Sequence, residues 1–155
     1  MPRYKVYPDT EWFHFHNENP KGRRTGDCVI RAIALATNQT WDEVLDDLVK
    51  VAHRTHYDLG CVECYGLYLS ELGWTKMKQP RKSDNTKYTG KEFINYIDAQ
   101  NYPFEVKILA HIGGHHITCF VEDTHPDNPE RVLLRCWDIW DPTDGTIGNY
   151  WIKQN

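Results

Sequence analysis

Residues 26–37 read GDCVIRAIALAT, in which a cysteine is followed by a run of almost entirely apolar residues. Asp27 is a typical N-cap residue, whose side chain accepts a hydrogen bond from the backbone of the next turn, so Cys28 is predicted as the first helical residue. Since the run is apolar on nearly every side, other elements are expected to cover this helix. Asn38 suits the left-handed residue that ends a helix. The stretch therefore predicts a buried central helix with a thiol at its N-terminal end.

Three further helices are expected downstream of this stretch. Thr40 and Glu43 have the spacing of a capping box and precede an amphipathic pattern. A third helix is expected over residues 62–72. Thr89 and Glu92 repeat the capping-box spacing at the start of a fourth.

Beyond Pro103 the apolar period changes from that of a helix to the two-residue period of a strand. Residues 104–108 alternate between apolar and charged side chains, and the turn-rich segment 124–130 is expected to close a hairpin. Three other segments are predicted as strands: residues 115–122, 131–140 and 146–153. This order predicts an α+β fold in which N-terminal helices, including the cysteine helix, pack on a C-terminal antiparallel sheet.

The chain has 155 residues, which is enough for one domain with a substantial core. We therefore expect residues 1–155 to form a single domain. Residues 1–25 carry three prolines and no helical period, and they are expected to form an extended arm ending in a loop. Within the arm, the stretch WFHFH at 12–16 has the alternation of a strand that packs its rings on the domain, or of a binding surface.

Charge and composition restrict the partners and the compartment. The formal charge of −4 gives no general field to hold a phosphate backbone, which argues against nucleic acid. The basic stretches 21–24 and 75–82 are short and are interpreted as solvated loops. No segment approaches the roughly 18 apolar residues of a membrane span, so no membrane partner is expected. Five cysteines without a regular framework are typical of a reducing compartment, which predicts a cytoplasmic protein with free thiols.

A thiol at the start of a helix meets unpaired backbone amides and the positive end of the helix dipole, and both favour the thiolate. Nucleophilic catalysis also needs an imidazole and a group that orients it. His115 and His116 begin a predicted strand, and a hairpin centred near residue 127 places His116 opposite a residue near Asp138. The sequence thus offers all three groups.

This order of residues resembles the papain-like cysteine peptidase fold over about residues 19–153. A cysteine opens a buried helix, a histidine starts a distant strand, and Asp138 on the next strand is followed two residues later by Trp140. Among small bacterial relatives, the bacteriocin-leader peptidases and NlpC-type peptidases are similar in layout. The resemblance implies Cys28 as nucleophile, His116 as general base and later acid, Asp138 as orienting group and Trp140 as a shield against water.

The chain departs from the papain pattern at the oxyanion hole. The papain family uses a glutamine shortly before the cysteine, whereas the nearest upstream amide here is Asn19. The backbone N–H of Cys28 supplies one donor regardless.

Two assignments within the resemblance stay open. Strand alternation puts His115 and His116 on opposite faces, and the family pattern of a histidine directly before the apolar strand favours His116. Asp141 is an alternative to Asp138, with Asp144 a more distant one.

Two functions from different classes follow. The first is a cysteine hydrolase that cleaves a peptide, isopeptide or amide bond through a thioester, acts on a protein or peptide substrate and requires no cofactor. The second is a non-catalytic papain-like binding module that sequesters or blocks a host protein or small ligand, motivated by the missing glutamine. Residues 19–33 and 138–151 also resemble small uncharacterised proteins of bacteriophages and Gram-positive bacteria, which suggests a phage-encoded protein.

A zinc site is a third alternative. Cys61 and Cys64 have the spacing of half a zinc site, and His53 and His56 lie just upstream. Ordinary structural thiols are favoured, because the four residues fall at the ends of two predicted helices and a closed site would need both ends to fold back sharply. Cys119 and Cys136 lie in apolar strand contexts and are expected in the core.

Overall fold

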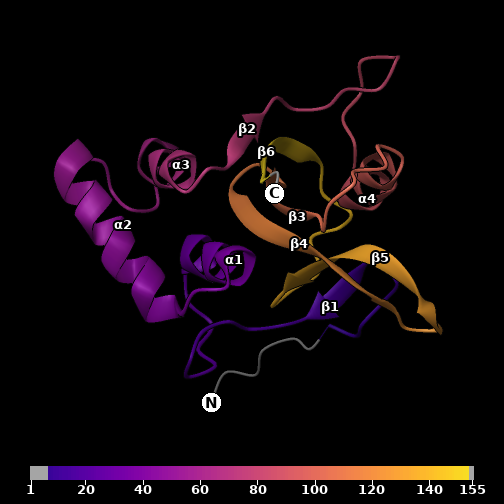
Figure 1. The fold of residues 1–155 in the computed structure, drawn as a ribbon, viewed down its shortest axis with the longest axis horizontal. Coiled ribbons are helices and arrows are strands. Elements are labelled where there is room, and N and C mark those ends of the chain that lie inside the picture. Colours follow the sequence, from indigo (N-terminus) through magenta and orange to yellow (C-terminus); the bar gives the residue numbers. More distant parts are fainter. Residues whose placement is uncertain (1–6, 154–155) are drawn as a thin grey trace.

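Helix α1 (Cys28–Thr37) lies at the centre of the computed structural model, between two other helices and the sheet (Figure 1). The structure describes residues 7–153. As predicted, the helix begins at Cys28, most of its residues are buried, and Asn38 ends it in the left-handed conformation with φ 56°. The predicted capping role of Asp27 was wrong, because its side chain makes no hydrogen bond to the backbone of the first turn. Asp27 instead binds three side chains that are described below.

Three other helices follow where the sequence predicted them: α2 (Trp41–Thr55), α3 (Val62–Glu71) and α4 (Gly90–Asp98). The Thr40 side chain accepts a hydrogen bond from the backbone N–H of Glu43 and so caps α2. Thr89 and Glu92 form the complete capping box of α4, with both reciprocal hydrogen bonds present. Among the described residues, no helix is long and apolar enough to cross a membrane.

The sheet has six strands in the order β1-β5-β4-β3-β6-β2. Their bounds are β1 (Phe13–Phe15), β2 (Thr75–Met77), β3 (Lys107–Ile112), β4 (His116–His125), β5 (Asn128–Asp138) and β6 (Ile147–Ile152). The α+β class is confirmed, but the expectation of a wholly antiparallel sheet was wrong, because β1 pairs parallel to β5. The strand expected from residue 104 begins only at Lys107.

Helices cover both faces of this sheet, and each face has its own apolar core. Helices α1, α2 and α3 pack on one face, against side chains such as Leu109, Ile117 and Cys119. Helix α4 packs on the other face, where Phe93 contacts Phe120 and Tyr150 edge to face. Because neighbouring strand residues point to opposite faces, β3 and β4 contribute to both cores.

The hairpin β4–β5 closes in the predicted segment, with a register that differs from the expectation by two residues. The closing pair His125–Asn128 is centred near residue 127, as expected, but an irregularity between Thr124 and His125 gives the rest of the hairpin a register in which Cys119 pairs with Trp137. A shift of two residues keeps every side chain on its expected face. His116 and Asp138 are therefore no longer directly opposite one another, yet both still lie at the same end of the hairpin.

The loop after Asp138 holds two other parts of the structure in place. Its Thr143 and Gly145 carbonyls accept hydrogen bonds from the first backbone N–H groups of α4. The neighbouring carbonyl of Thr146 accepts from Gly113 N–H at 3.0 Å, in the β3–β4 turn that leads to His116. This loop thus fixes the turn that carries the candidate imidazole.

A substitution at Gly90 tests the contact between α4 and the loop after Asp138. A Cβ added at Gly90 would lie 2.9 Å from Thr143 Cα and 3.0 Å from Ile112 Cδ1. We expect Gly90→Ala to lower the free energy of unfolding by about 1–3 kcal/mol, since backbone must move to admit the methyl group. Gly66→Ala in α3 is the matched control, because its Cβ would make an ordinary 3.8 Å contact with Val62. That change should raise the free energy of unfolding by about 0.5–1 kcal/mol. Urea-induced unfolding measures both, and equal effects would contradict the tight contact.

Candidate active site

Cys28 is the first residue of α1 and is half-buried where that helix meets β4. The first backbone N–H groups of a helix have no partner within it, so the thiol lies where partial positive charge favours a thiolate. The ring of His116 and the backbone of Ile117 both interact with its thiol and lower the pKa of that group. The structure therefore brings Cys28 and His116 into direct contact.

His116 is the first residue of β4 and follows a turn in which Gly113 and Gly114 both have positive φ. Such backbone favours glycine, since a side chain there would be strained. The Nε2 atom of His116 lies 2.5 Å from Asp138 Oδ2. Because an imidazole has only two nitrogens, Nδ1 is left to make the contact with Cys28.

Asp138 ends β5 and is only 3% exposed. Besides His116, its Oδ2 accepts a hydrogen bond from the Thr118 hydroxyl at 2.7 Å. Its Oδ1 accepts from Arg31 Nη1 at 3.0 Å and from the backbone N–H of Ile139 at 2.7 Å. With four donors around it, this carboxylate has one position and one orientation.

Arg31 is part of the site and was not recognised from the sequence. It lies on α1 close to one turn after Cys28, is 7% exposed, and its Nε donates to Asp27 Oδ1 at 2.7 Å. Asp27 Oδ2 in turn accepts from Asn19 Nδ2 and Trp41 Nε1, each at 3.0 Å. The available signal was a single charged residue within an apolar run, four positions after a carboxylate.

The surroundings shift the pKa of each member of the Cys28–His116–Asp138 group. Burial raises the pKa of the Cys28 thiol, but hydrogen bonds from His116 and Ile117 and the charges of His116 and Arg31 bring it below its ordinary value. Burial disfavours a charged His116, yet Asp138 and Cys28 raise its pKa to about 9. Burial raises the pKa of Asp138, and the His116 contact with other donors outweighs this and lowers it. These directions favour a thiolate and an imidazolium between the two pKa values.

Four other residues named from the sequence, His115, Asp141, Asn19 and Trp140, lie around this group. His115 is exposed in the turn. Asp141 accepts hydrogen bonds from the backbone and hydroxyl of Thr143 and so shapes the following loop. The amide nitrogen of Asn19 donates to Asp27, where it orients that carboxylate. The centroid of the Trp140 ring lies 4.9 Å from that of the His116 ring.

The four residues of the zinc alternative do not converge. Cys61 and His56 are the caps of two different helices, and His53 lies in the last turn of α2. Cys64 is buried, with its sulfur 3.7 Å from the carbonyl oxygen of Leu48. Within residues 7–153, no three side chains from His, Cys, Asp and Glu are grouped to hold a metal ion.

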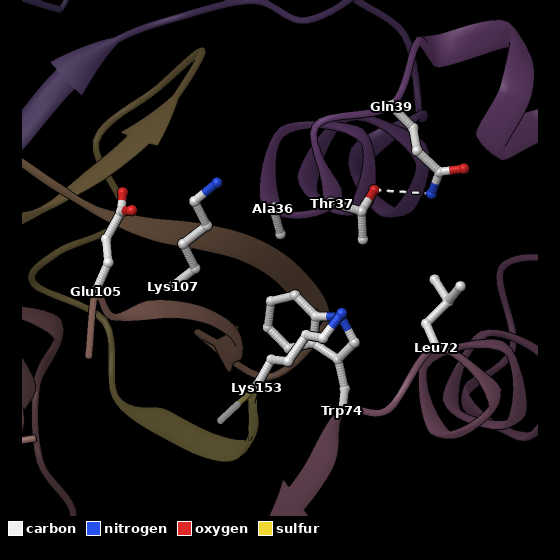
Figure 2. Close-up of a pocket in the computed structure, with 8 residues that line it drawn as sticks. All are labelled: Ala36, Thr37, Gln39, Leu72, Trp74, Glu105, Lys107 and Lys153. Carbon is white, nitrogen blue, oxygen red and sulfur yellow. Dashed lines mark hydrogen bonds between the residues drawn. The ribbon is translucent and has the colours of Figure 1, made fainter. Parts of the chain in front are cut away.

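Cys28 itself lines a space of about 10 Å³ together with Arg31 and Asp138, and two larger cavities differ in their position relative to it. One, of about 330 Å³, lies near the C-terminal end of α1, and Figure 2 shows Lys107, Lys153 and Trp74 among its lining side chains. The second is a polar cleft of about 280 Å³ lined by His111 and Gly114, next to the turn that carries His116. Most of the other residues that line the second cleft belong to the segments 75–88 and 141–149.

The rate of Cys28 alkylation by iodoacetamide is expected to rise with pH through a midpoint below 9.0, the ordinary value for a thiol, because only the thiolate reacts. His116→Asn removes the hydrogen bond and charge of the imidazole and leaves the burial, so its midpoint should move upward. Mass spectrometry of the labelled peptides measures both. Cys119 and Cys136 serve as internal controls, since burial raises the pKa of each and both should stay unlabelled. A midpoint at or above 9.0 in the unmodified protein would contradict the assignment.

Comparison with known proteins returned no relative with which this site can be aligned. No protein-family model matches the chain, and no curated protein or solved structure matches it. The candidate site is therefore defined by the contacts, burial and charges of its own residues.

Proposed function

We propose that the protein is a papain-like cysteine hydrolase that cleaves a peptide, isopeptide or amide bond. One observation carries the proposal: the Cys28 thiol interacts with the ring of His116, whose Nε2 atom lies 2.5 Å from the buried carboxylate of Asp138. A nucleophile, a base in contact with it and a third group that orients the base are what nucleophilic catalysis requires. The order of α1, α2 and α3 before the strands β3 to β6 supports the same fold type.

In the proposed reaction, the Cys28 thiolate attacks the carbonyl carbon of the substrate and a carbon–sulfur bond forms. The carbonyl electron pair moves to oxygen, and the backbone N–H of Cys28 donates to that oxyanion. The imidazolium of His116 gives its proton to the leaving amine as the carbon–nitrogen bond breaks, which leaves a thioester. His116 then takes a proton from water, the hydroxide attacks the thioester, and the acid product leaves with the thiolate restored. Asp138 holds the ring in place through both steps.

The buried charges favour an enzyme over a non-catalytic binding module. Asp27, Arg31 and Asp138 are each less than 10% exposed, and ionised groups removed from water are costly unless their partners are fixed. A binding module would need neither a low pKa at Cys28 nor a raised one at His116. All five cysteines are free, which supports action in a reducing compartment such as the cytoplasm, and a protein or peptide is the proposed substrate.

An activated ester tests the proposal without knowledge of the natural substrate. With p-nitrophenyl acetate, we expect a burst of p-nitrophenol and an acetyl thioester on Cys28 that mass spectrometry detects. Cys28→Ala should abolish both. His116→Asn should slow acylation by roughly 10²–10⁴-fold, because the activating base is lost.

Cys61→Ala is the matched control, since Cys61 is also a half-buried free thiol near a helix start and should leave the burst unchanged. An acyl group spread over several cysteines, or a burst that survives Cys28→Ala, would contradict the hydrolase. In that case Cys28→Ala should also leave any partner binding intact, as the binding module predicts.

A further inference from the structure

The polar cleft beside the β3–β4 turn adjoins the proposed nucleophile. His111, in its wall, pairs across the sheet with Ile117, whose backbone contacts the Cys28 sulfur. Gly114, also in the wall, lies two residues before His116. The cleft is thus continuous with the turn that presents the imidazole. The rest of the wall is formed by Gln79, Lys87, Thr146, Gly148 and Asn149.

Hydrogen bonds hold the outer wall of the cleft in place. The backbone N–H of Gln79 donates to Asn149 Oδ1 at 3.1 Å, and the Gln79 side chain donates to the Ile147 carbonyl at 2.8 Å. The ring of His111 is hydrogen-bonded to the hydroxyl of Tyr65. The cleft is therefore preformed between the segment that follows β2 and the start of β6.

The charge of the cleft is positive. Lys87 is the cationic side chain in its wall, no carboxylate lines it, and Lys87 has no ion-pair partner among the described residues. The acidic groups nearest to Lys87 in the chain have other partners: Asp84 accepts hydrogen bonds from the backbone and hydroxyl of Thr86, and Glu92 pairs with Lys82. Asp144, near Thr146, pairs with Lys91 at 2.9 Å. Burial and the charge of Lys76 lower the pKa of His111, so that ring is neutral at neutral pH.

The position of the cleft indicates which part of a substrate enters it. In the proposed mechanism His116 donates its proton to the leaving amine, so the leaving group must lie on the side of the imidazole. The turn that carries His116 forms one wall of the cleft through Gly114. The part of the substrate that follows the scissile bond is accordingly the part closest to Lys87.

We propose that this cleft is a specificity subsite for acidic peptides, in which Lys87 binds a side-chain carboxylate on the C-terminal side of the scissile bond. The inference rests on the proposed hydrolase function and adds the class of substrate. It also gives a role to Lys87, which lies just beyond the basic stretch 75–82 that was interpreted as a solvated loop.

N-chloroacetyl tripeptide amides of sequence Ala-Xaa-Ala test the subsite, because Cys28 displaces the chloride while the peptide extends toward the leaving-group side. With Xaa as Glu, the second-order rate of Cys28 labelling should exceed that with Gln by about five-fold, the ratio for opposite charges roughly 4 Å apart in water. The Lys peptide should be slowest. Lys87→Glu should reverse this order of rates, and Lys87→Gln should abolish the preference for the Glu peptide. Salt at about 0.5 M should weaken the preference, because it screens the two charges.

Lys78→Glu is the matched control, because Lys78 is exposed on the same segment and does not line the cleft. It should keep the order of the unmodified protein, and an equal change in Lys78→Glu and Lys87→Glu would overturn the subsite. Equal rates for the Glu and Lys peptides together with fast iodoacetamide labelling of Cys28 would overturn the charge selectivity alone. Slow labelling of Cys28 by every reagent would overturn the hydrolase function with it.

Discussion

The buried guanidinium of Arg31 is the constraint on which the site depends. It binds the carboxylate of Asp27 just before α1 and that of Asp138 at the end of β5, 107 residues away in the chain. Removing one partner from a buried charge group typically costs about 3–5 kcal/mol, because the remaining charge has no water to replace it. Helix α1 can therefore dock on the sheet in only one register, and that register sets the Cys28 sulfur against His116.

The same charges connect the packing of the fold to its chemistry. A cation behind the Cys28 thiol and an imidazolium beside it both favour a thiolate, while the carboxylate that contacts the imidazole is itself held by Arg31 and Thr118. Each ionised form depends on its neighbour in a region of low dielectric, where such interactions are strong. The site is thus one electrostatic unit rather than three separate residues.

Local signals in the sequence predicted the elements with local causes: α1 with its left-handed end, the capped helices and the β4–β5 hairpin. Strand β1 lies within the stretch 12–16, whose alternation already suggested a strand. Strand β2 was not predicted, because its three residues are too few to show a period and it is defined by its pairing with β6. Asp27 has the side chain of a cap, but Arg31 and Trp41 offer stronger donors that only the tertiary structure brings near. Alternation could not choose between His115 and His116, because the choice depends on how the glycine turn before them is oriented.

The distance along the chain between the parts of the site has a consequence for biosynthesis. Cys28 belongs to the first quarter of the sequence, whereas Asp138 belongs to the last fifth, and long-range contacts of this kind form late in folding. Until β4 and β5 have been made and paired, the thiol has neither its imidazole nor the buried carboxylate that orients it. A chain emerging from the ribosome would therefore carry an ordinary, weakly reactive thiol, and nucleophilic reactivity would be acquired only by the finished fold.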